Sequence, residues 1–167
     1  MECQYEFLPM KTTSILFLSL LISNINLQAQ SESAVDLVPP NFVKEFYKAY
    51  SGIPTTEKLA PFYHEEVVID DPTYDWVGTN KQTIFKNFTK SNEVNEYTWQ
   101  IDQVIAQGNK LVTEGILKAK YKGIPYSMRF VNIFHFKDGL IVKQYDYFDN
   151  ADYFKAVEES KKKKSEP

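Results

Sequence analysis

The stretch MRFVNIFHFKDGLIVKQYDYFD, residues 128–149, decides the fold of this chain. Its two arms are rich in Phe, Tyr, Val and Ile, which favour β-strands, and they flank the turn residues Lys137, Asp138 and Gly139. The stretch therefore predicts a β-hairpin. The closure of the turn decides which side chains share a face, because a shift of one residue moves a whole strand's side chains to the other face.

The hairpin can close in two ways. If Asp138 and Gly139 form a two-residue turn, Phe136 pairs with Ile141. Asn132 and Asp146 then lie on opposite faces of the sheet. If the turn is instead type I, with a left-handed glycine in a bulge, the pairing moves by one residue and brings these two side chains to one face.

We prefer the bulged register, because it gathers the apolar side chains on one face. Its pairs are Phe136 with Leu140, Phe134 with Val142, Asn132 with Gln144 and Phe130 with Asp146. Its apolar face carries Met128, Phe130, Phe134, Phe136, Leu140, Val142 and Phe148, and its other face carries Arg129, His135, Lys137 and Lys143. Three polar residues, Asn132, Gln144 and Asp146, lie among the apolar ones. Buried polar groups are costly unless they are satisfied, so this cluster is either a bonded structural network or the polar part of a ligand pocket.

The first thirty residues have the pattern of a secretory signal peptide. A basic start at Met10-Lys11 precedes the apolar run 15–22, which is too short to span a bilayer, and Ala29 offers a small residue for cleavage. We expect cleavage near Ala29 or Gln30, with Met10 as an alternative start; a signal anchor is the competing interpretation. The domain would then be secreted or periplasmic, with no attachment to the membrane.

Composition limits the function classes. The 167 residues suit one domain, and a net charge of -3 with a pI near 5.5 argues against a nucleic-acid partner. The single cysteine, Cys3, provides neither a disulfide framework nor a cysteine metal site. His64 and His135 lack the spacing of a metal pair, and no metal, nucleotide or flavin motif occurs, so we expect no cofactor.

Hydrophobic periodicity predicts a linker over 31–40, a domain over 41–158 and a disordered basic tail over 159–167. Within the domain we expect helices over 41–50, 55–63 and 79–88, a short strand over 67–69, a loop at 76–78, strands over 97–105 and 111–121, the hairpin, and a short helix from 150 to 157. Helices that are separate from the strands predict an α+β fold. The expected architecture is a curved antiparallel sheet that forms a cone, covered by the three N-terminal helices. A cone with an aromatic wall can hold a small apolar molecule.

This order of elements, together with FHFKDGLIVKQYDYFDNADYF (134–154), resembles the nuclear transport factor 2-like superfamily, and within it the SnoaL-like and ketosteroid-isomerase-like proteins. The likeness covers about Asn41 to Val157. It implies the cystatin-like cone fold. It implies no single activity, because this fold carries isomerases, cyclases, epoxide hydrolases, dehydratases and proteins that only bind.

The resemblance to ketosteroid isomerases suggests roles for three residues. Asp71, followed by Pro72, matches that family's general base, and Tyr47 stands 24 residues earlier, at the spacing of the family's tyrosine. Asn132 falls where the family has the acid that holds the oxyanion. An amide can still donate a hydrogen bond to a developing oxyanion, although the family's protonated acid is absent.

Limonene epoxide hydrolases offer a second comparison. Asp146 in QYDYFD (144–149) matches the first Asp of their Trp-Arg-Asp-Tyr-Phe-Asp ending, which is a catalytic base. Their Arg-x-Asp pair falls on Gly115 and Leu117. The resemblance therefore implies a base at Asp146 without epoxide opening.

Together these residues predict an aromatic-lined site for a small hydrophobic molecule, with cofactor-free proton transfer as its chemistry. Asp71 or Asp146 would be the base, and Tyr47 and Asn132 would donate hydrogen bonds to an enolate-like oxygen. The side chains expected to line the pocket are Phe46, Trp76, Trp99, Phe130, Phe134, Gln144 and Phe148. Each assignment has a structural alternative: Asp71 can turn the chain before Pro72, and Tyr47 can be helix core.

The competing hypothesis is a non-catalytic module that binds a ligand or forms a homodimer. The outer face of the hairpin carries apolar residues among its charges, namely Val131, Ile133, Ile141, Tyr145 and Tyr147. Such a face can pair with a second copy of the chain, as this superfamily often does.

Overall fold

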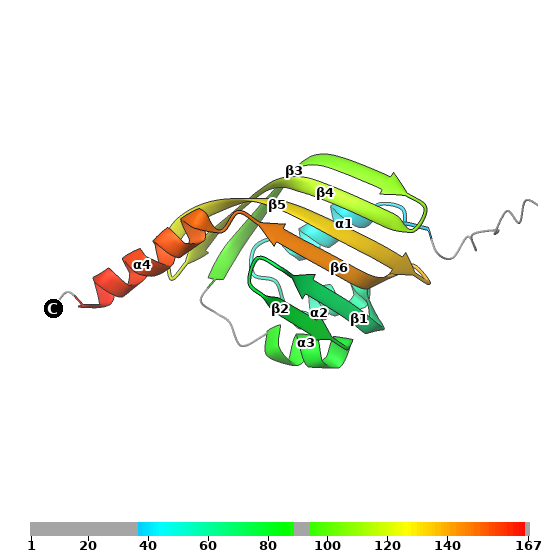
Figure 1. Ribbon diagram of the computed structural model, residues 1–167, viewed down its shortest axis with the longest axis horizontal. Helices are drawn as coiled ribbons and strands as arrows, with labels where there is room; N and C mark the ends of the chain where they lie inside the picture. Colours follow the sequence, from blue (N-terminus) through cyan, green and yellow to red (C-terminus); the bar gives the residue numbers. More distant parts are fainter. Residues whose placement is uncertain (1–36, 89–93, 166–167) are drawn as a thin grey trace, which may run out of the picture. The chain divides into compact units, whose positions relative to one another are not determined.

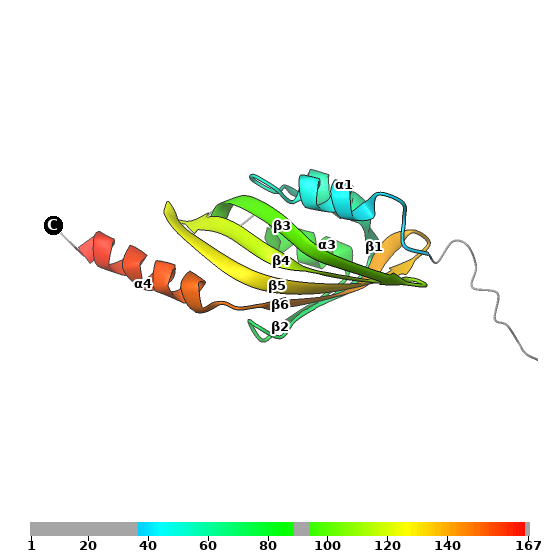
Figure 2. The same ribbon diagram turned by 90° about the horizontal axis from the view of Figure 1, so that it is seen from above.

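The computed structural model describes residues 37–88 and 94–165, and the expected signal peptide lies outside these ranges. Within these ranges, six strands form one sheet in the order β2-β1-β6-β5-β4-β3 (Figure 1). The strands are β1 (Tyr63–Asp71), β2 (Trp76–Thr79), β3 (Val94–Gln107), β4 (Lys110–Tyr121), β5 (Ile124–Lys137) and β6 (Leu140–Phe148), and the helices are α1 (Phe42–Ala49), α2 (Thr56–Leu59), α3 (Lys81–Phe88) and α4 (Ala151–Ser165). Figure 2 shows a curved sheet that does not close, with α1 over one of its faces. The predicted α+β class is confirmed.

Three elements differ from the sequence prediction in the first half of the chain. The second helix stops at Leu59 and continues as a 3₁₀ turn (Ala60–Phe62), because Pro61 supplies no amide for an α-helical bond. Tyr63 therefore begins β1, which is longer than the three residues expected. The segment predicted as a loop at 76–78 belongs to β2, which pairs with β1 from Val68 to Asp71. A four-residue strand leaves too short a pattern to be recognised from sequence.

One strand pair is parallel within a sheet that was expected to be antiparallel. β1 runs parallel to β6, with Ile69 opposite Gln144 and Asp70 opposite Tyr145. The other neighbouring pairs of the sheet are antiparallel. The parallel pair places the end of β1, with Asp71, beside the stretch of β6 that carries Asp146. Segments far apart in sequence thus meet at one place on the sheet.

The hairpin closes by the two-residue turn, so the bulged register that we preferred is wrong. Asp138 and Gly139 both have positive φ, 53° and 75°, as a two-residue type I′ turn requires. Phe136 accordingly pairs with Ile141. Ile141 is fully buried, and it belongs to the core rather than to the outer face where we expected it.

A bulge does occur, but it lies further along β6. Phe136 pairs with Ile141 and His135 with Lys143, so Val142 is the extra residue. This one-residue shift brings Asn132 opposite Asp146. The two side chains share a face, as predicted, although the register that was expected to produce this arrangement is not the one observed.

The core lies between α1 and the covered face of the sheet and consists largely of aromatic rings. Phe134 is fully buried and contacts Phe42 and Phe46, with ring centroids 5.3 Å apart in both pairs. Phe42 also meets Phe136 edge to face at 4.8 Å. Edge-to-face pairs add to the stabilisation that burial provides. Leu140 and Val142, which were predicted on the apolar face of the hairpin, are only half-buried. In the observed register Ile141 lies on that face instead and is fully buried.

The C-terminal helix is longer than expected. α4 continues through Lys161–Lys164 to Ser165, where the sequence predicted a disordered tail. Ion pairs three and four residues apart support the extension: Lys161 Nζ lies 2.6 Å from Glu158 Oε1, and Lys163 Nζ lies 2.9 Å from Glu159 Oε1. Among the described residues, no helix has the length and apolar character to cross a membrane.

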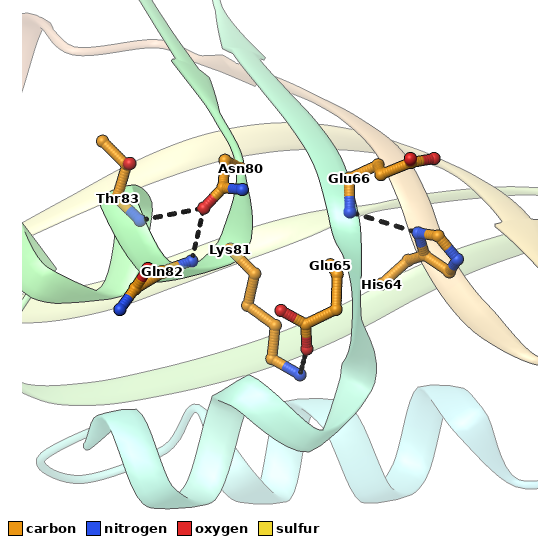
Figure 3. Close-up of polar contacts among 7 residues, drawn as sticks. All are labelled: His64, Glu65, Glu66, Asn80, Lys81, Gln82 and Thr83. Atoms are coloured by element: carbon orange, nitrogen blue, oxygen red, sulfur yellow. Dashed lines mark hydrogen bonds and ion pairs between the residues drawn. The ribbon is translucent and has the colours of Figure 1, made fainter.

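The N-terminus of α3 is capped by Asn80 (Figure 3). Its Oδ1 accepts hydrogen bonds from the backbone amides of Gln82 at 3.0 Å and Thr83 at 3.4 Å. Figure 3 also shows Lys81 Nζ paired with Glu65 Oε1 at 3.0 Å, and His64 Nδ1 accepting from the amide of Glu66 at 3.2 Å.

Replacing Asn80 with alanine is expected to lower the free energy of unfolding by about 1–2 kcal/mol, since it removes the cap and places alanine at a φ of 68°, which asparagine tolerates better. Asn80→Gly also lacks the cap but tolerates this φ, so it should lose about half as much or less. Urea unfolding of the two variants measures the difference. Equal losses would show that the positive φ contributes nothing.

Candidate functional site

A cavity of about 170 Å³ opens on the face of the sheet that carries the core, and we call it the aspartate cavity. Its rings include Trp76, Trp99 and Phe148, and aliphatic side chains, among them Leu59, Ile69 and Ile84, complete its apolar wall. Its polar part consists of Asp71, Asn132, Gln144 and Asp146. Among the described side chains, no Lys, Arg or His lines it. The cavity thus combines an apolar enclosure with carboxyl and amide groups on one side, as expected for a site that takes a small molecule.

The carboxylate of Asp146 is held by two amides. Asn132 Nδ2 donates to its Oδ1 at 2.5 Å, and Gln144 Nε2 donates to Oδ1 at 2.9 Å and to Oδ2 at 2.8 Å. Asn132 and Gln144 are 3% and 4% exposed, whereas Asp146 is less completely buried. The amides fix the orientation of the carboxylate, and both of its oxygens accept hydrogen bonds.

The two amides are oriented in turn by hydroxyl groups. Tyr47 donates to Asn132 Oδ1 at 3.0 Å and shares a 2.5 Å hydrogen bond with Thr113 Oγ1. Tyr63 donates to Gln144 Oε1 at 2.8 Å. Each amide therefore accepts with its oxygen and donates with its nitrogen toward Asp146. The network makes Asp146 the terminal acceptor of two chains of hydrogen bonds.

Burial raises the pKa of Asp146 to about 7. The hydrogen bonds from Gln144 and Asn132 oppose this rise, and the nearby charge of Asp71 adds to it. The pKa lies near neutrality, so the carboxyl can both accept and return a proton at physiological pH.

Asp71 both turns the chain and lines the cavity. Its Oδ1 accepts from the backbone amide of Thr73 at 3.1 Å, and its carbonyl accepts from the amide of Tyr74 at 3.2 Å. Burial raises the pKa of Asp71 to about 6, and its hydrogen bonds to the backbone moderate the rise. The structural and the ligand-facing interpretations of this residue are therefore compatible.

Tyr47 lies behind the cavity wall rather than in it. It is buried on α1, its ring packs against Trp99 at 5.2 Å, and its hydroxyl is engaged by Thr113 and Asn132. Burial raises the pKa of Tyr47 well above its ordinary value, so the phenol stays protonated. Asn132 does line the cavity, and only one of its two N–H bonds is needed for Asp146.

Of the remaining residues expected in the pocket, five line the aspartate cavity, namely Phe46, Trp76, Trp99, Gln144 and Phe148. Phe130 and Phe134 do not line it. Phe130 packs edge to face against Trp99 at 4.9 Å, and Phe134 lies within the ring cluster of the core. These two rings support the wall from behind.

Sequence reasoning missed Tyr63 and Thr113, the two hydroxyl residues at the far ends of the network. Tyr63 was assigned to the end of a helix, so nothing placed it near Gln144. The sequence did indicate Thr113, because it is a polar residue in line with Leu111 and Leu117 on the apolar side of its strand. In the structure Thr113 is fully buried.

Metal binding and epoxide opening find little support in the described residues. No group of three or more His, Cys, Asp or Glu side chains is arranged to hold a metal ion. Gly115, where the resemblance to epoxide hydrolases would place an arginine, has no room for a side chain, because a Cβ there would lie 1.9 Å from the carbonyl oxygen of Gln100.

Comparison with known proteins places this chain in a family. Residues 43–144, more than half of the chain, match the model of the SnoaL-like domain, and no curated protein matches the chain. Similar solved structures are a protein of Catenulispora acidiphila with a ketosteroid isomerase-like fold, in complex with trimethylamine (14% identity, TM-score 0.62, covering 71% of this chain and 93% of that one), a candidate SnoaL-like polyketide cyclase of Shewanella denitrificans (18%, 0.61, 71% and 96%) and an epoxide hydrolase of M. tuberculosis (16%, 0.56, 71% and 84%). At such identities these likenesses concern the fold alone. The family match shows that this chain belongs to the SnoaL-like domain family, and the similar structures agree with the nuclear transport factor 2-like fold.

Proposed function

We propose that this domain binds a small, largely apolar carbonyl compound in the aspartate cavity and moves a proton on it without a cofactor, as isomerases and cyclases do. The observation that carries the proposal is the carboxylate of Asp146, which is oriented by two amides in an apolar wall and has a pKa raised to about 7. A general base works best when its pKa lies near the working pH.

In the proposed step, an oxygen of Asp146 takes a proton from the carbon next to the carbonyl. The electron pair of the broken C–H bond forms a C=C bond, and the carbonyl π pair moves to oxygen to give an enolate. The second N–H of Asn132 supports this oxygen, since preorganised donors stabilise developing negative charge. The protonated carboxyl then returns a proton to carbon, which leaves the enzyme unchanged. In D₂O the carboxyl first exchanges its proton for deuterium, so that deuterium is returned to carbon.

Proton exchange on a simple ketone tests the proposal. Cyclohexanone is incubated in D₂O with the full chain, and the loss of its α-proton signal is followed by NMR. We expect exchange at least tenfold faster than with acetate at the same concentration, because the cavity removes water and fixes the base. If cyclohexanone shows neither exchange nor a chemical-shift change when the protein is added, this function is excluded.

The exchange rate should depend on pH in a defined direction. Only ionised carboxylates accept a proton, and the pKa values of Asp71 and Asp146 are raised to about 6 and about 7. The rate should therefore rise with pH, with a midpoint near 7, and level off about one pH unit above it. Asp71→Asn removes a negative charge that raises the pKa of Asp146, so the midpoint of this variant's rate-against-pH curve should lie at lower pH than in the wild type. An unshifted midpoint would show that the two carboxyls do not interact.

The second candidate function is a homodimerising module, and one observation favours it. The face of the sheet away from α1 leaves apolar side chains partly exposed, with Val131, Ile133 and Tyr145 half-buried and Tyr147 42% exposed. Light scattering on the purified domain distinguishes a monomer from a dimer. A dimer that dissociates when Ile133 is replaced by Lys would support this face as the interface, and a monomer at high protein concentration would exclude it.

A further inference from the structure

A second cavity, of about 220 Å³, adjoins the aspartate cavity. Four side chains, Tyr50, Asp71, Trp99 and Phe148, line both cavities. The second cavity is also bordered by Tyr74, Tyr97, Tyr126 and Tyr153, and we call it the tyrosine cavity. Because the two spaces share Asp71 and three rings, a ligand in one lies beside the wall of the other.

The tyrosine cavity depends on the C-terminal helix. Tyr153, in the first turn of α4, meets Tyr126, Tyr121 and Tyr74 with ring centroids 5.4, 5.7 and 6.0 Å apart. α4 begins at Ala151, whereas the match to the SnoaL-like domain ends at residue 144. One of the rings that line this cavity therefore comes from a part of the chain beyond the family match.

The phenol groups around this cavity make it chemically different from its neighbour. The hydroxyl of Tyr74 donates to the thioether of Met128, with the oxygen 3.8 Å from Sδ. A thioether is a weak acceptor, so a hydroxyl or carbonyl oxygen of a ligand would be a stronger partner. Burial raises the pKa of Tyr97 to about 12, which keeps that phenol protonated and able to donate.

We propose that the tyrosine cavity holds the oxygen-bearing end of an elongated ligand whose carbonyl end lies in the aspartate cavity. Tyr74 donates a hydrogen bond to that oxygen, and Tyr153 determines how long a ligand the site accepts. This inference rests on the proposed function, and it adds the ligand class: two linked rings, with a carbonyl at one end and a hydroxyl at the other.

Three ketones test this arrangement on the full chain. Cyclohexanone fills one cavity only, 4-cyclohexylcyclohexanone reaches into the second, and 4-(4-hydroxycyclohexyl)cyclohexanone adds the hydroxyl. Dissociation constants come from NMR titration. The wild-type chain should bind the hydroxylated probe about fivefold more tightly than the unsubstituted two-ring probe, as one net hydrogen bond predicts. Tyr74→Phe should abolish this preference and leave cyclohexanone binding unchanged.

The helix is tested with a matched pair of neighbouring substitutions. Tyr153→Ala removes the ring from the cavity and should weaken both two-ring probes about tenfold, with cyclohexanone changed less than twofold. Phe154→Ala is the control, because Phe154 is the next residue on α4, is 50% exposed and does not line the cavity. It should leave all three constants unchanged.

The outcomes separate this inference from the proposed function. If cyclohexanone binds but Tyr74→Phe keeps the hydroxyl preference, or Tyr153→Ala acts like Phe154→Ala, the two-cavity inference is wrong and the proposed function stands. If none of the three ketones binds the wild-type chain, both fail. If the hydroxyl preference and the Tyr153 effect both occur, the inference holds.

Discussion

Asp146→Asn is expected to lower the rate of cyclohexanone α-proton exchange by about 10²–10⁴-fold, the contribution typical of a general base. The amide keeps the shape of the carboxyl but cannot accept a proton at neutral pH. Asn132 and Gln144 can still donate to the new Oδ1, but the hydrogen bond from Gln144 to Oδ2 is lost, because an NH2 group replaces that oxygen. NMR exchange in D₂O measures the loss. A variant that keeps more than half of the rate would move the base to Asp71.

The same substitution should leave the fold intact and stabilise it at alkaline pH. Burial raises the pKa of Asp146 to about 7 in the folded chain, above the value of about 4 typical of an unfolded chain. The folded state therefore binds this proton more strongly, so the contribution of Asp146 to stability is greatest at low pH and falls as pH rises from about 4 to about 7. Asparagine removes this dependence.

Urea unfolding at pH 4 and pH 8 checks the sign. Asp146→Asn should gain stability over the wild type at pH 8 and little or none at pH 4. Glu114→Gln is the matched control, because Glu114 is an exposed carboxylate on β4 next to the network residue Thr113. It should change neither the exchange rate nor the pH dependence. A loss of stability at pH 8 in Asp146→Asn would mean that the carboxylate is needed to hold the two amides.

The sequence predicted the polar cluster correctly but not the strand register that forms it. Both registers that we considered placed every irregularity at the turn, whereas the bulge lies at Val142. Leu140, Ile141 and Val142 are all apolar, so their pattern fits either face. β6 also pairs with β1, with Val68 opposite Lys143, and this contact joins segments more than seventy residues apart. Local periodicity contains no information about such a partner.

The long-range pairing also explains which site residues could be found. Asp146 and Asn132 lie on adjacent strands of one hairpin, so their spacing in sequence is sufficient to relate them. Tyr63 reaches Gln144 only because β1 crosses the domain to lie beside β6. Trp76 was expected at the pocket and does line it, although the strand that carries it was predicted as a loop.

The largest loss of stability is expected from Phe134→Ala, at about 3–5 kcal/mol in the free energy of unfolding. Phe134 is fully buried, and its ring meets Phe42 and Phe46 at 5.3 Å each, so truncation removes apolar contact and leaves a hole between α1 and β5. Such a loss is a large part of the free energy of unfolding of a typical domain, which is about 5–15 kcal/mol.

Equilibrium unfolding in urea measures this loss, with Phe154→Ala as the control for removal of a phenylalanine ring. Phe154 is 50% exposed, so its truncation should change stability by about 0.5 kcal/mol or less. Since Phe134 does not line the aspartate cavity, the folded fraction of Phe134→Ala should keep its cyclohexanone exchange rate. A stability loss below about 1 kcal/mol would show that the neighbouring rings close the hole. A normal stability with lost exchange would instead place Phe134 in the ligand site, as the sequence alone had suggested.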